Sequence, residues 1–261
     1  ILNNDEIIEA QNLINDLYKI KVDAIIFQDM GLLELDLPPI KLFASTQCHN
    51  ISCEKIKFLE QCGVSRVILA RELSLEQIEN ICKNTNCEIE TFVHGALCVS
   101  YSGQCYFSAY NGNRSANRGN CAQVCRKKYN LLNSKGEILK KDKHLLSLKD
   151  FNASEYLEKL INAGVTSFKI EGRLKDESYI KNVVAFYRQK LDKIIQKEYR
   201  TSYGEINFDF TPDINKTFNR GYCTYFLCGK RDKISNFDSP KSIGEKLSLI
   251  HISEPTRLAL I

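Results

Sequence analysis

Four cysteines that could bind a metal lie in one short window of this chain. They are Cys98, Cys105, Cys121 and Cys125, spaced as C-x6-C, fifteen residues, then C-x3-C. Thiolates bind metals, and four of them are what an iron–sulfur cluster or a structural zinc site requires. Zinc sites usually use closely spaced pairs, so C-x6-C fits a cluster slightly better, although spacing leaves zinc open. Cys121 and Cys125 would share one face if their segment is helical.

The remaining cysteines point to a reducing compartment. The chain has eleven cysteines in 261 residues, an odd number, together with long amphipathic segments. A secreted disulfide scaffold is usually short and loop-rich, so we expect a cytoplasmic protein whose other cysteines are mostly core residues. Cys48, in STQCHN after an expected strand, is the reserve ligand. Neither a signal peptide nor a transmembrane run of about 18 apolar residues is present, so no membrane association is expected.

Positive charge is concentrated beside the cysteines. Segment 114–149 carries ten Lys or Arg residues against two acidic ones, or +8, whereas the whole chain carries +4. The segment therefore predicts an anionic partner, either nucleic acid or a small carboxylate, unless it is simply a solvated basic face. Within it, the substrate-binding candidates are Arg114, Asn117 and Arg118.

Aromatic residues precede these arginines in the sequence. Tyr101, Tyr106, Phe107 and Tyr110 could stack on unpaired bases. Aromatic residues are also ordinary core residues, and we expect at least two of these four in the core.

Short β-type runs alternate with amphipathic helical patterns. The expected strands cover residues 22–27, 41–45, 66–70, 88–93 and 166–170. The expected helices cover residues 6–18, 53–62, 73–85, 154–164 and 176–195. This alternation predicts βα units and a parallel sheet. A doubly wound sheet would be expected to show a Gly-rich phosphate loop, which is absent, so we expect a (β/α) TIM-type barrel.

Polar residues follow the expected strands. They are Gln47, then Arg71 and Glu72, then His94, then Glu171 and Arg173. In a (β/α) barrel the loops after the strands build the active site, so we take Gln47 as substrate-binding and the others as catalytic candidates.

Two of these candidates have a second interpretation. His94 is either a general acid or base, or a hydrogen-bonded histidine with no titrating role. Arg173 either forms a bidentate pair with a carboxylate or phosphate, or pairs internally with Glu171.

The chain divides into three predicted parts. Residues 1–199 form an N-terminally incomplete (β/α) barrel with a cysteine-rich insertion at about 95–130, because five strands do not close an eight-stranded barrel. Residues 200–247 begin a small β-rich C-terminal domain. Residues 248–261, which include His251, resemble a non-native read-through tail and carry no functional argument.

The segment ETFVHGALCVSYSGQCYFS closely resembles the signature of the collagenase-like peptidase family, peptidase family U thirty-two. The resemblance continues through RSANRGNCAQVCRKKY and GVTSFKIEGRLKDESYI and covers roughly residues 24–246. STQCHN, VILARELSLEQI and LLSLKD are most similar to the branch that hydroxylates ribosomal RNA. A sister branch hydroxylates the wobble uridine of transfer RNA.

The resemblance implies a barrel with a 4Fe-4S cluster on Cys98, Cys105, Cys121 and Cys125, with zinc as the alternative metal. It implies hydroxylation of a pyrimidine of 23S ribosomal RNA, or of the transfer RNA wobble uridine, with prephenate as a small anionic co-substrate. Ribosomal RNA is then the expected partner. Two other functions stay open: a collagenase-like peptidase, and a non-catalytic subunit that carries the cluster. The chain contains neither H-E-x-x-H nor G-x-S-x-G, so no hydrolytic group is identified.

Overall fold

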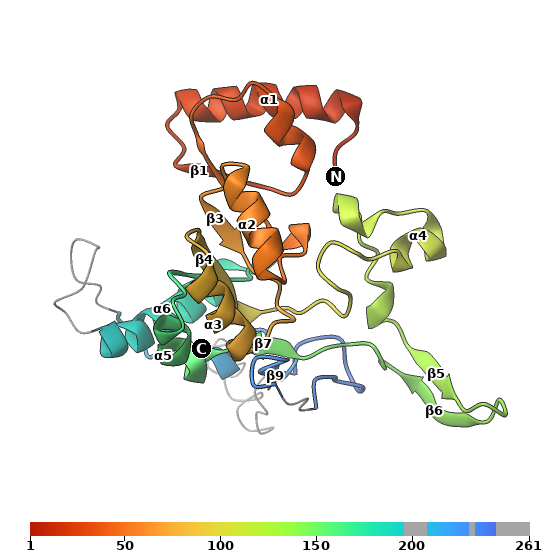
Figure 1. Cartoon of the computed structure of the whole chain (residues 1–261). Helices are drawn as coiled ribbons and strands as arrows, with labels where there is room; N and C mark the ends of the chain where they lie inside the picture. Colours follow the sequence, from red (N-terminus) through yellow and green to blue (C-terminus); the bar gives the residue numbers. More distant parts are fainter. Residues whose placement is uncertain (196–207, 230–232, 244–261) are drawn as a thin grey trace, which may run out of the picture.

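Five parallel strands form the centre of the protein (Figure 1). In order across the sheet they are β1 (Ala24–Phe27), β2 (Lys41–Ala44), β3 (Arg66–Ile68), β4 (Glu88–Gly95) and β8 (Ser167–Ile170). These five strands lie where the sequence places them, so the predicted parallel α/β sheet is confirmed. The carboxyl ends of parallel strands meet at one edge of a sheet, which brings the polar residues that follow them together.

The structure is a computed structural model, and it describes residues 1–195, 208–229 and 233–243. The predicted boundary at residue 199 and the predicted tail 248–261 lie outside these residues. Within them, no helix is both long and apolar enough to cross a membrane.

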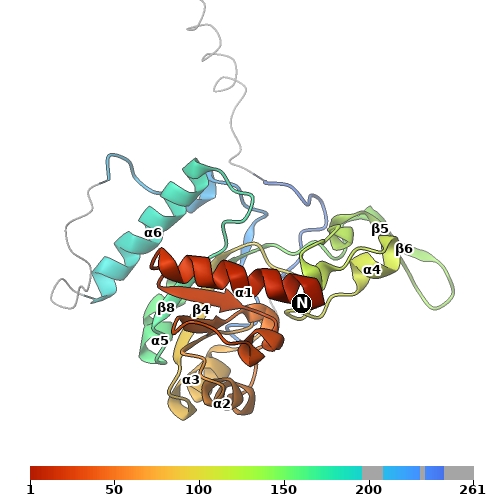
Figure 2. The ribbon, with the colours of Figure 1, turned by 90° about the horizontal axis from the view of Figure 1, so that it is seen from above.

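The helices begin where the sequence supplies an N-cap. Asn3 and Ser74 each form a capping box, and the side chain of Ser52 accepts the amide of Lys55. The main helices are α1 (Asn4–Lys19), α2 (Cys53–Gln61), α3 (Leu75–Asn84), α5 (Leu157–Asn162) and α6 (Glu177–Ile195). Their apolar faces bury residues such as Ile56 in the same core as the strands. Figure 2 shows α6 at the left of the view and the insertion that follows β4 at the right.

Two further strands extend the sheet beyond β4. β7 (Asp150–Asn152) pairs antiparallel with the end of β4, and β9 (Tyr222–Cys223) pairs parallel with β7. Across the described part of the chain the strands form an open sheet and not a closed barrel. The described residues after 207 contribute β9 to this sheet, and the predicted C-terminal β-rich domain stays a prediction.

Strand β4 is buried along nearly its whole length because it has neighbours on both sides. Its polar residue Glu90 is only 6% exposed, and two cations neutralise it. Arg66 approaches Glu90 from β3 at 3.3 Å, and Lys169 approaches it from β8 at 3.2 Å. A buried charge is tolerated only when it is paired, so these contacts hold the three strands in register.

The segment between β4 and β7 leaves the sheet and forms the cysteine-rich insertion. It contains the short helix α4 (Phe107–Gly112) and an antiparallel hairpin of β5 (Tyr129–Leu132) and β6 (Ile138–Lys143). Figures 1 and 2 both show this hairpin projecting away from the body of the protein. Its residues are almost all exposed, so it adds little to the core.

Candidate active site at the carboxyl ends of the strands

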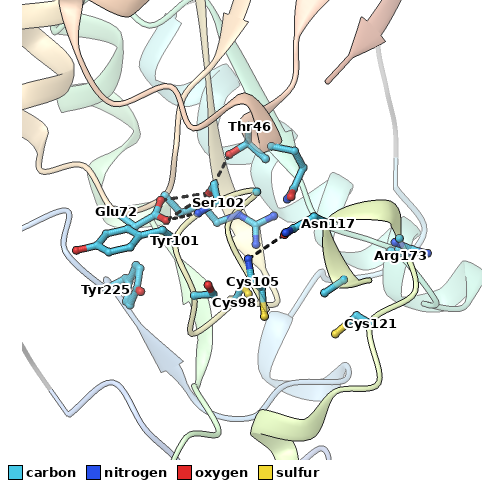
Figure 3. A pocket seen from close by; sticks show the side chains of 16 residues that line it. Thr46, Glu72, Cys98, Tyr101, Ser102, Cys105, Asn117, Cys121, Arg173 and Tyr225 are labelled. Atoms are coloured by element: carbon cyan, nitrogen blue, oxygen red, sulfur yellow. Dashed lines mark hydrogen bonds between the residues drawn. The ribbon is translucent and has the colours of Figure 1, made fainter. Parts of the chain in front are cut away.

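A pocket of about 310 Å³ opens where the loops after the parallel strands meet the cysteine-rich insertion (Figure 3). Four predicted site residues from the strand ends line it: Gln47, Arg71, Glu72 and Arg173. The insertion contributes Cys98, Cys105, Asn117 and Cys121. The structure therefore brings eight of the predicted site residues to one cavity.

Arg71 is the central cation of the pocket wall. Its Nη2 atom lies 3.2 Å from Oε2 of Glu171, and its Nη1 atom donates to the carbonyl of Ala96. The guanidinium also stacks on the ring of Phe92, 3.8 Å from the ring centre. These contacts tie the loops after β3, β4 and β8 together, so Arg71 is held as part of the site's framework.

Glu72 holds the loop between the first two cysteines. Its carboxylate accepts the backbone N–H of Ser102 at 2.8 Å and is also approached by the Ser102 hydroxyl. The Thr46 hydroxyl lies 3.4 Å from the same serine hydroxyl. A Cβ at Gly103 would lie 2.0 Å from the carbonyl oxygen of Gln47, and this glycine has φ +73°. Only glycine lets the loop approach this closely, so Glu72 and Gly103 together fix the floor of the pocket.

The four predicted ligands lie within electrostatic range of one another. Desolvation raises the pKa of the Cys98 thiol, and the nearby Cys105 and Cys121 raise it further. Desolvation also raises the pKa of Cys125; Arg126 opposes this shift, and the other three thiols add to it. Figure 3 shows the sulfur of Cys121 directed toward those of Cys98 and Cys105.

The two halves of the insertion are joined at the cysteines. The side-chain oxygen of Asn117 accepts the backbone N–H of Cys105 at 2.8 Å. The segment through Cys121 and Cys125 is not an α-helix, so the condition under which they would share one helical face is not met. Gln123 has a left-handed conformation at φ 52°, and only a single turn, Val124–Arg126, follows it. A left-handed residue interrupts an α-helix, so the two thiols are positioned by a loop.

Four thiols could serve either a cluster or a single metal ion. Among the residues that the structure describes, no three His, Cys, Asp or Glu side chains are grouped closely enough to hold one metal ion. A zinc site places its sulfur ligands about 2.3 Å from one centre. An iron–sulfur cluster is several atoms wide and is bound by thiolates spaced more widely. The choice between a cluster and zinc therefore stays a prediction.

Cys48 does not join this set. Its sulfur lies 3.6 Å from the carbonyl oxygen of Phe27 and 3.4 Å from that of Gln28, in the core at the end of β1. All eleven cysteines lie in the described residues, and none forms a disulfide.

Arg173 presents a free cation to the pocket. Its backbone N–H donates to Oε1 of Glu171 at 2.8 Å, but among the described residues its guanidinium has no hydrogen-bond or ion-pair partner. The acid that we considered as its internal partner is paired with Arg71 instead. Arg173 is therefore available to a carboxylate or phosphate in the pocket.

His94 does not reach the pocket. It is 1% exposed and lies among Tyr179, Tyr187 and Tyr222, with Nδ1 3.3 Å from the Tyr187 hydroxyl. Burial lowers its pKa to about 4, so it is neutral near pH 7. This placement agrees with a structural histidine and contradicts a general acid or base that touches substrate.

The two arginines between the cysteine pairs also lie outside the pocket lining. Nη2 of Arg118 lies 2.7 Å from both carboxylate oxygens of Glu6 in α1. Nε of Arg114 donates to the carbonyl of Asn120 at 3.1 Å. Both arginines thus hold the insertion in place, and the geometry offers no direct support for their predicted role in substrate binding.

The expectation that at least two of the four aromatic residues are in the core is wrong. Tyr101, Tyr106 and Tyr110 are 64%, 72% and 90% exposed. Phe107 is half-buried and stacks on Tyr129. Tyr101 lines the pocket, so one exposed ring stands at its wall.

Sequence reasoning missed several residues of the site. Thr46 and Ser102 are polar loop residues without a distinctive motif, and Tyr225 reaches the pocket from a distant segment. Arg126 supports Cys125 by donating to the Leu97 carbonyl at 3.0 Å and to Ser147 at 2.8 Å. Its position directly after the last cysteine was a signal that could have identified it.

The fold and the pocket define an α/β protein with a cysteine-lined site at the ends of its parallel strands. Residues 1–236 match the profile of Peptidase family U32, and the chain belongs to this family.

Relatives of the chain are named for different activities. It is 53% identical over 247 residues to a 23S rRNA 5-hydroxycytidine synthase of Escherichia coli (strain K12), covering 94% of this chain and 38% of that protein. It is 31% identical to tRNA hydroxylation protein P of the same organism, over 87% of this chain and 60% of that protein. It is 30% identical to a collagenase of Porphyromonas gingivalis, over 88% of this chain and 58% of that protein. The chain thus spans between 38% and 60% of the length of these relatives.

Proposed function

We propose that this chain is part of an enzyme that hydroxylates a pyrimidine of RNA with the help of an iron–sulfur cluster. The observation that carries the proposal is the meeting of three of the four cysteines and a free arginine, Arg173, in one pocket. The names of the relatives supply the reaction. Ribosomal RNA is the preferred substrate because the relative named for 23S rRNA is 53% identical, against 31% for the transfer RNA protein.

The residues of the pocket divide into three roles in this proposal. Cys98, Cys105, Cys121 and Cys125 would hold a 4Fe-4S cluster. Such a cluster supplies one-electron chemistry when bound. Arg173 would bind a carboxylate of the co-substrate, prephenate, by a charge-assisted hydrogen bond. Arg71 and Glu72 would keep the pocket in shape, because their side chains are already engaged with the surrounding loops.

RNA suits the surface around the pocket. Tyr101 offers an exposed ring at the pocket wall, and an unpaired base can stack on such a ring. The basic segment 114–149 offers counter-charges to phosphates. We also propose a cytoplasmic location, because free cysteines persist in a reducing compartment. The neighbouring order of the five parallel strands supports a (β/α) barrel as the wider fold.

A collagenase-like peptidase is the second candidate because the family and one relative carry that name. A serine peptidase needs a base beside its nucleophile. Ser100 and Ser102 line the pocket, but no histidine is among the described residues that line it. The pocket therefore supports hydroxylation better than peptide hydrolysis.

Deletion of the gene that encodes this chain tests the proposal. Mass spectrometry of ribosomal and transfer RNA should show the loss of one hydroxylated pyrimidine. The wild-type gene should restore it, Cys105→Ser should not, and Cys62→Ser should, because Cys62 is the exposed C-cap residue of α2 and is not part of the insertion. Unchanged RNA modification together with cleavage of gelatin by the purified protein would favour the peptidase. Unchanged modification without cleavage would favour a non-catalytic subunit.

A further inference from the structure

A second hollow, separate from the cysteine-lined pocket, has five basic side chains among the residues that line it. It has a volume of about 410 Å³ and lies between strand β6 and the segment 233–243. Its basic side chains are Lys140, Lys143, Lys149, Arg220 and Lys233, against one acidic side chain, Asp238. We call these five basic residues and the hollow that they line the basic groove.

The floor of the basic groove is fixed by backbone hydrogen bonds between two distant segments. The amide of Lys149 donates to the carbonyl of Ile234 at 2.8 Å, and the amide of Asn236 donates to that of Ser147 at 2.7 Å. The amide of His144 donates to the carbonyl of Phe237 at 3.0 Å. The groove is therefore a built feature of the fold and not a chance gathering of mobile side chains.

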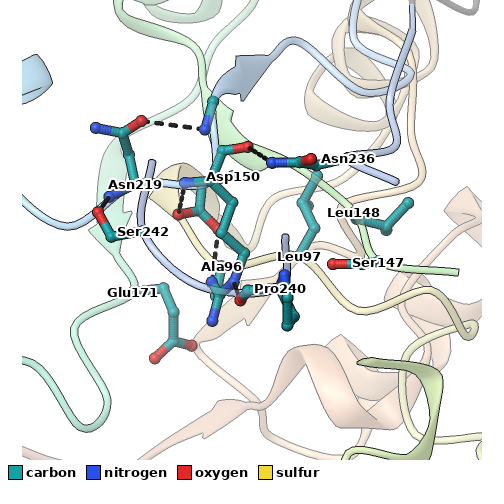
Figure 4. A network of polar contacts seen from close by, with 12 residues as sticks. Ala96, Leu97, Ser147, Leu148, Asp150, Glu171, Asn219, Asn236, Pro240 and Ser242 are labelled. Atoms are coloured by element: carbon teal, nitrogen blue, oxygen red, sulfur yellow. Dashed lines mark hydrogen bonds and ion pairs between the residues drawn. The ribbon is translucent and has the colours of Figure 1, made fainter. Parts of the chain in front are cut away.

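Arg220 belongs to the framework of the groove. Its Nη1 atom lies 2.9 Å from Oδ1 of Asp150, which is 3% exposed, and its Nε donates to the Pro240 carbonyl at 2.7 Å. The side chain of Asn236 donates to the Arg220 carbonyl at 3.1 Å. Figure 4 shows Asp150, Asn236 and Pro240 gathered in this network. The charge of Arg220 is thus largely balanced by Asp150.

The remaining lysines leave an excess of positive charge. Lys143 is paired with Asp238 at 2.7 Å, which engages the one acid of the groove. Within the described residues, Lys140 and Lys149 form no ion pair. The positive charge of Lys233 lowers the pKa of Asp238, but Lys233 forms no ion pair with it. An ordinary solvated face mixes both signs of charge, whereas this hollow concentrates one sign.

Hydrogen bonds of Arg126 connect the basic groove to the cysteine site. Arg126, next to Cys125, donates to the Ser147 hydroxyl at 2.8 Å and to the Leu148 carbonyl at 2.6 Å. Both acceptors lie in the segment that forms the groove floor. An anionic polymer bound in the groove would therefore sit on the same framework as the cysteine-lined pocket.

We propose that the basic groove binds the sugar–phosphate backbone of RNA and so holds the substrate strand at a second point. The proposal rests on the proposed function for the identity of the polymer. Several unpaired lysines along a hollow suit a chain of phosphates better than one small anion, because each phosphate offers its own charge. The groove would contribute affinity and register and would not select the base.

Binding of a labelled RNA at different salt concentrations tests the groove. The probe is fluorescein-labelled oligouridylate, its anisotropy is measured with the full chain over a KCl series, and the test variant is Lys140→Gln/Lys149→Gln/Lys233→Gln. The slope of log K against log [KCl] is negative for a protein that binds phosphates. Removing three phosphate contacts on a single strand should make it less steep by about 2. The same relation gives a loss of affinity of roughly 100-fold near 0.1 M KCl.

The matched control is Lys41→Gln/Lys55→Gln/Lys57→Gln, which removes the same charge from exposed positions on β2 and α2. The control should keep the wild-type slope. Three results would each overturn the proposal. They are an unchanged slope in the groove variant, an equal change of slope in the control, and no binding of the probe by the wild-type chain. Urea unfolding of both variants verifies that they fold.

The assay measures binding alone, so it separates this proposal from the proposed function. A groove-dependent slope in a protein without hydroxylase activity would leave the groove supported and the reaction wrong. Hydroxylase activity together with an unchanged slope in the groove variant would support the reaction and show that the groove proposal is wrong.

Discussion

Nη2 of Arg71 and Oε2 of Glu171 lie 3.2 Å apart and join the loop after β3 to the loop after β8. The two residues are separated by 100 positions in the chain. Because Glu171 is engaged by Arg71, the nearby Arg173 keeps its guanidinium free for a ligand. The ion pair thus fixes the guanidinium of Arg71 and leaves that of Arg173 unpaired in the same pocket.

Glu171→Gln should destabilise the protein without removing the pocket. The substitution leaves the half-buried guanidinium of Arg71 without its counter-charge but keeps an acceptor for the amide of Arg173. Hydrogen bonds to charged groups contribute about 1.5–3 kcal/mol, so we expect the free energy of unfolding to fall by about 1–3 kcal/mol. Urea unfolding at neutral pH measures it. A matched Glu177→Gln variant, which removes an exposed pair with Lys181, should leave the free energy of unfolding nearly unchanged.

Arg173→Gln should weaken ligand binding and leave the stability of the protein nearly unchanged. No described side chain depends on this guanidinium, so the free energy of unfolding should stay within about 0.5 kcal/mol of the wild type. Loss of a charge-assisted hydrogen bond to a carboxylate should weaken prephenate binding by about tenfold or more. Calorimetric titration of prephenate into the wild-type and variant proteins measures this difference. Equal affinity in both proteins would show that the co-substrate does not use this arginine.

The elements of this fold could be predicted because each depends on local pattern. The apolar runs at β1 to β4 and the capping residues Asn3 and Ser74 are readable from neighbouring residues alone. The grouping of the cysteines was readable too, because all four lie in one short segment of the chain.

Contacts between distant segments could not be predicted in the same way. His94 follows the expected strand 88–93, but in the structure it lies within β4, and tyrosines from α6 and β9 enclose it. The partner of Glu171 depends on how β3 and β8 are placed around β4. The i, i+4 spacing of Cys121 and Cys125 suggested a helix, and the left-handed Gln123 between them overrides that pattern.

Gly103→Ala should loosen the loop that carries the first two cysteines. A methyl group there would lie 2.0 Å from the Gln47 carbonyl oxygen, and the positive φ alone costs a side chain about 1–2 kcal/mol. We expect a loss of stability of at least about 1 kcal/mol and a lower iron content after anaerobic reconstitution. Gly112→Ala is the control, because its added methyl group meets no atom within 4 Å. Equal iron content in the two variants would contradict a role for Gly103 in placing the cysteines.

Cys125→Ser and Cys48→Ala should separate a ligand from a core residue. Cys125 is in electrostatic contact with the other three thiols, whereas Cys48 faces backbone carbonyls at the end of β1. We expect reconstituted Cys125→Ser to lose most of its iron and sulfide and Cys48→Ala to keep them. Colorimetric iron and sulfide assays on both variants provide the measurement. The reverse pattern would make Cys48 the fourth ligand.

His94 should make the protein less stable in mild acid. Burial lowers its pKa to about 4 in the folded state, whereas an unfolded chain has a histidine pKa of about 6.5. Between these values the unfolded state binds more protons, so the free energy of unfolding falls as the pH drops from about 6.5 to about 4. The difference amounts to about 3 kcal/mol at most. Urea unfolding across this range should show a steeper pH dependence in the wild type than in His94→Gln, since carboxylates contribute equally to both. NMR titration of the His94 ring, assigned by its absence from the His94→Gln spectrum, gives the folded pKa directly, and a value near 6.5 would refute the burial argument.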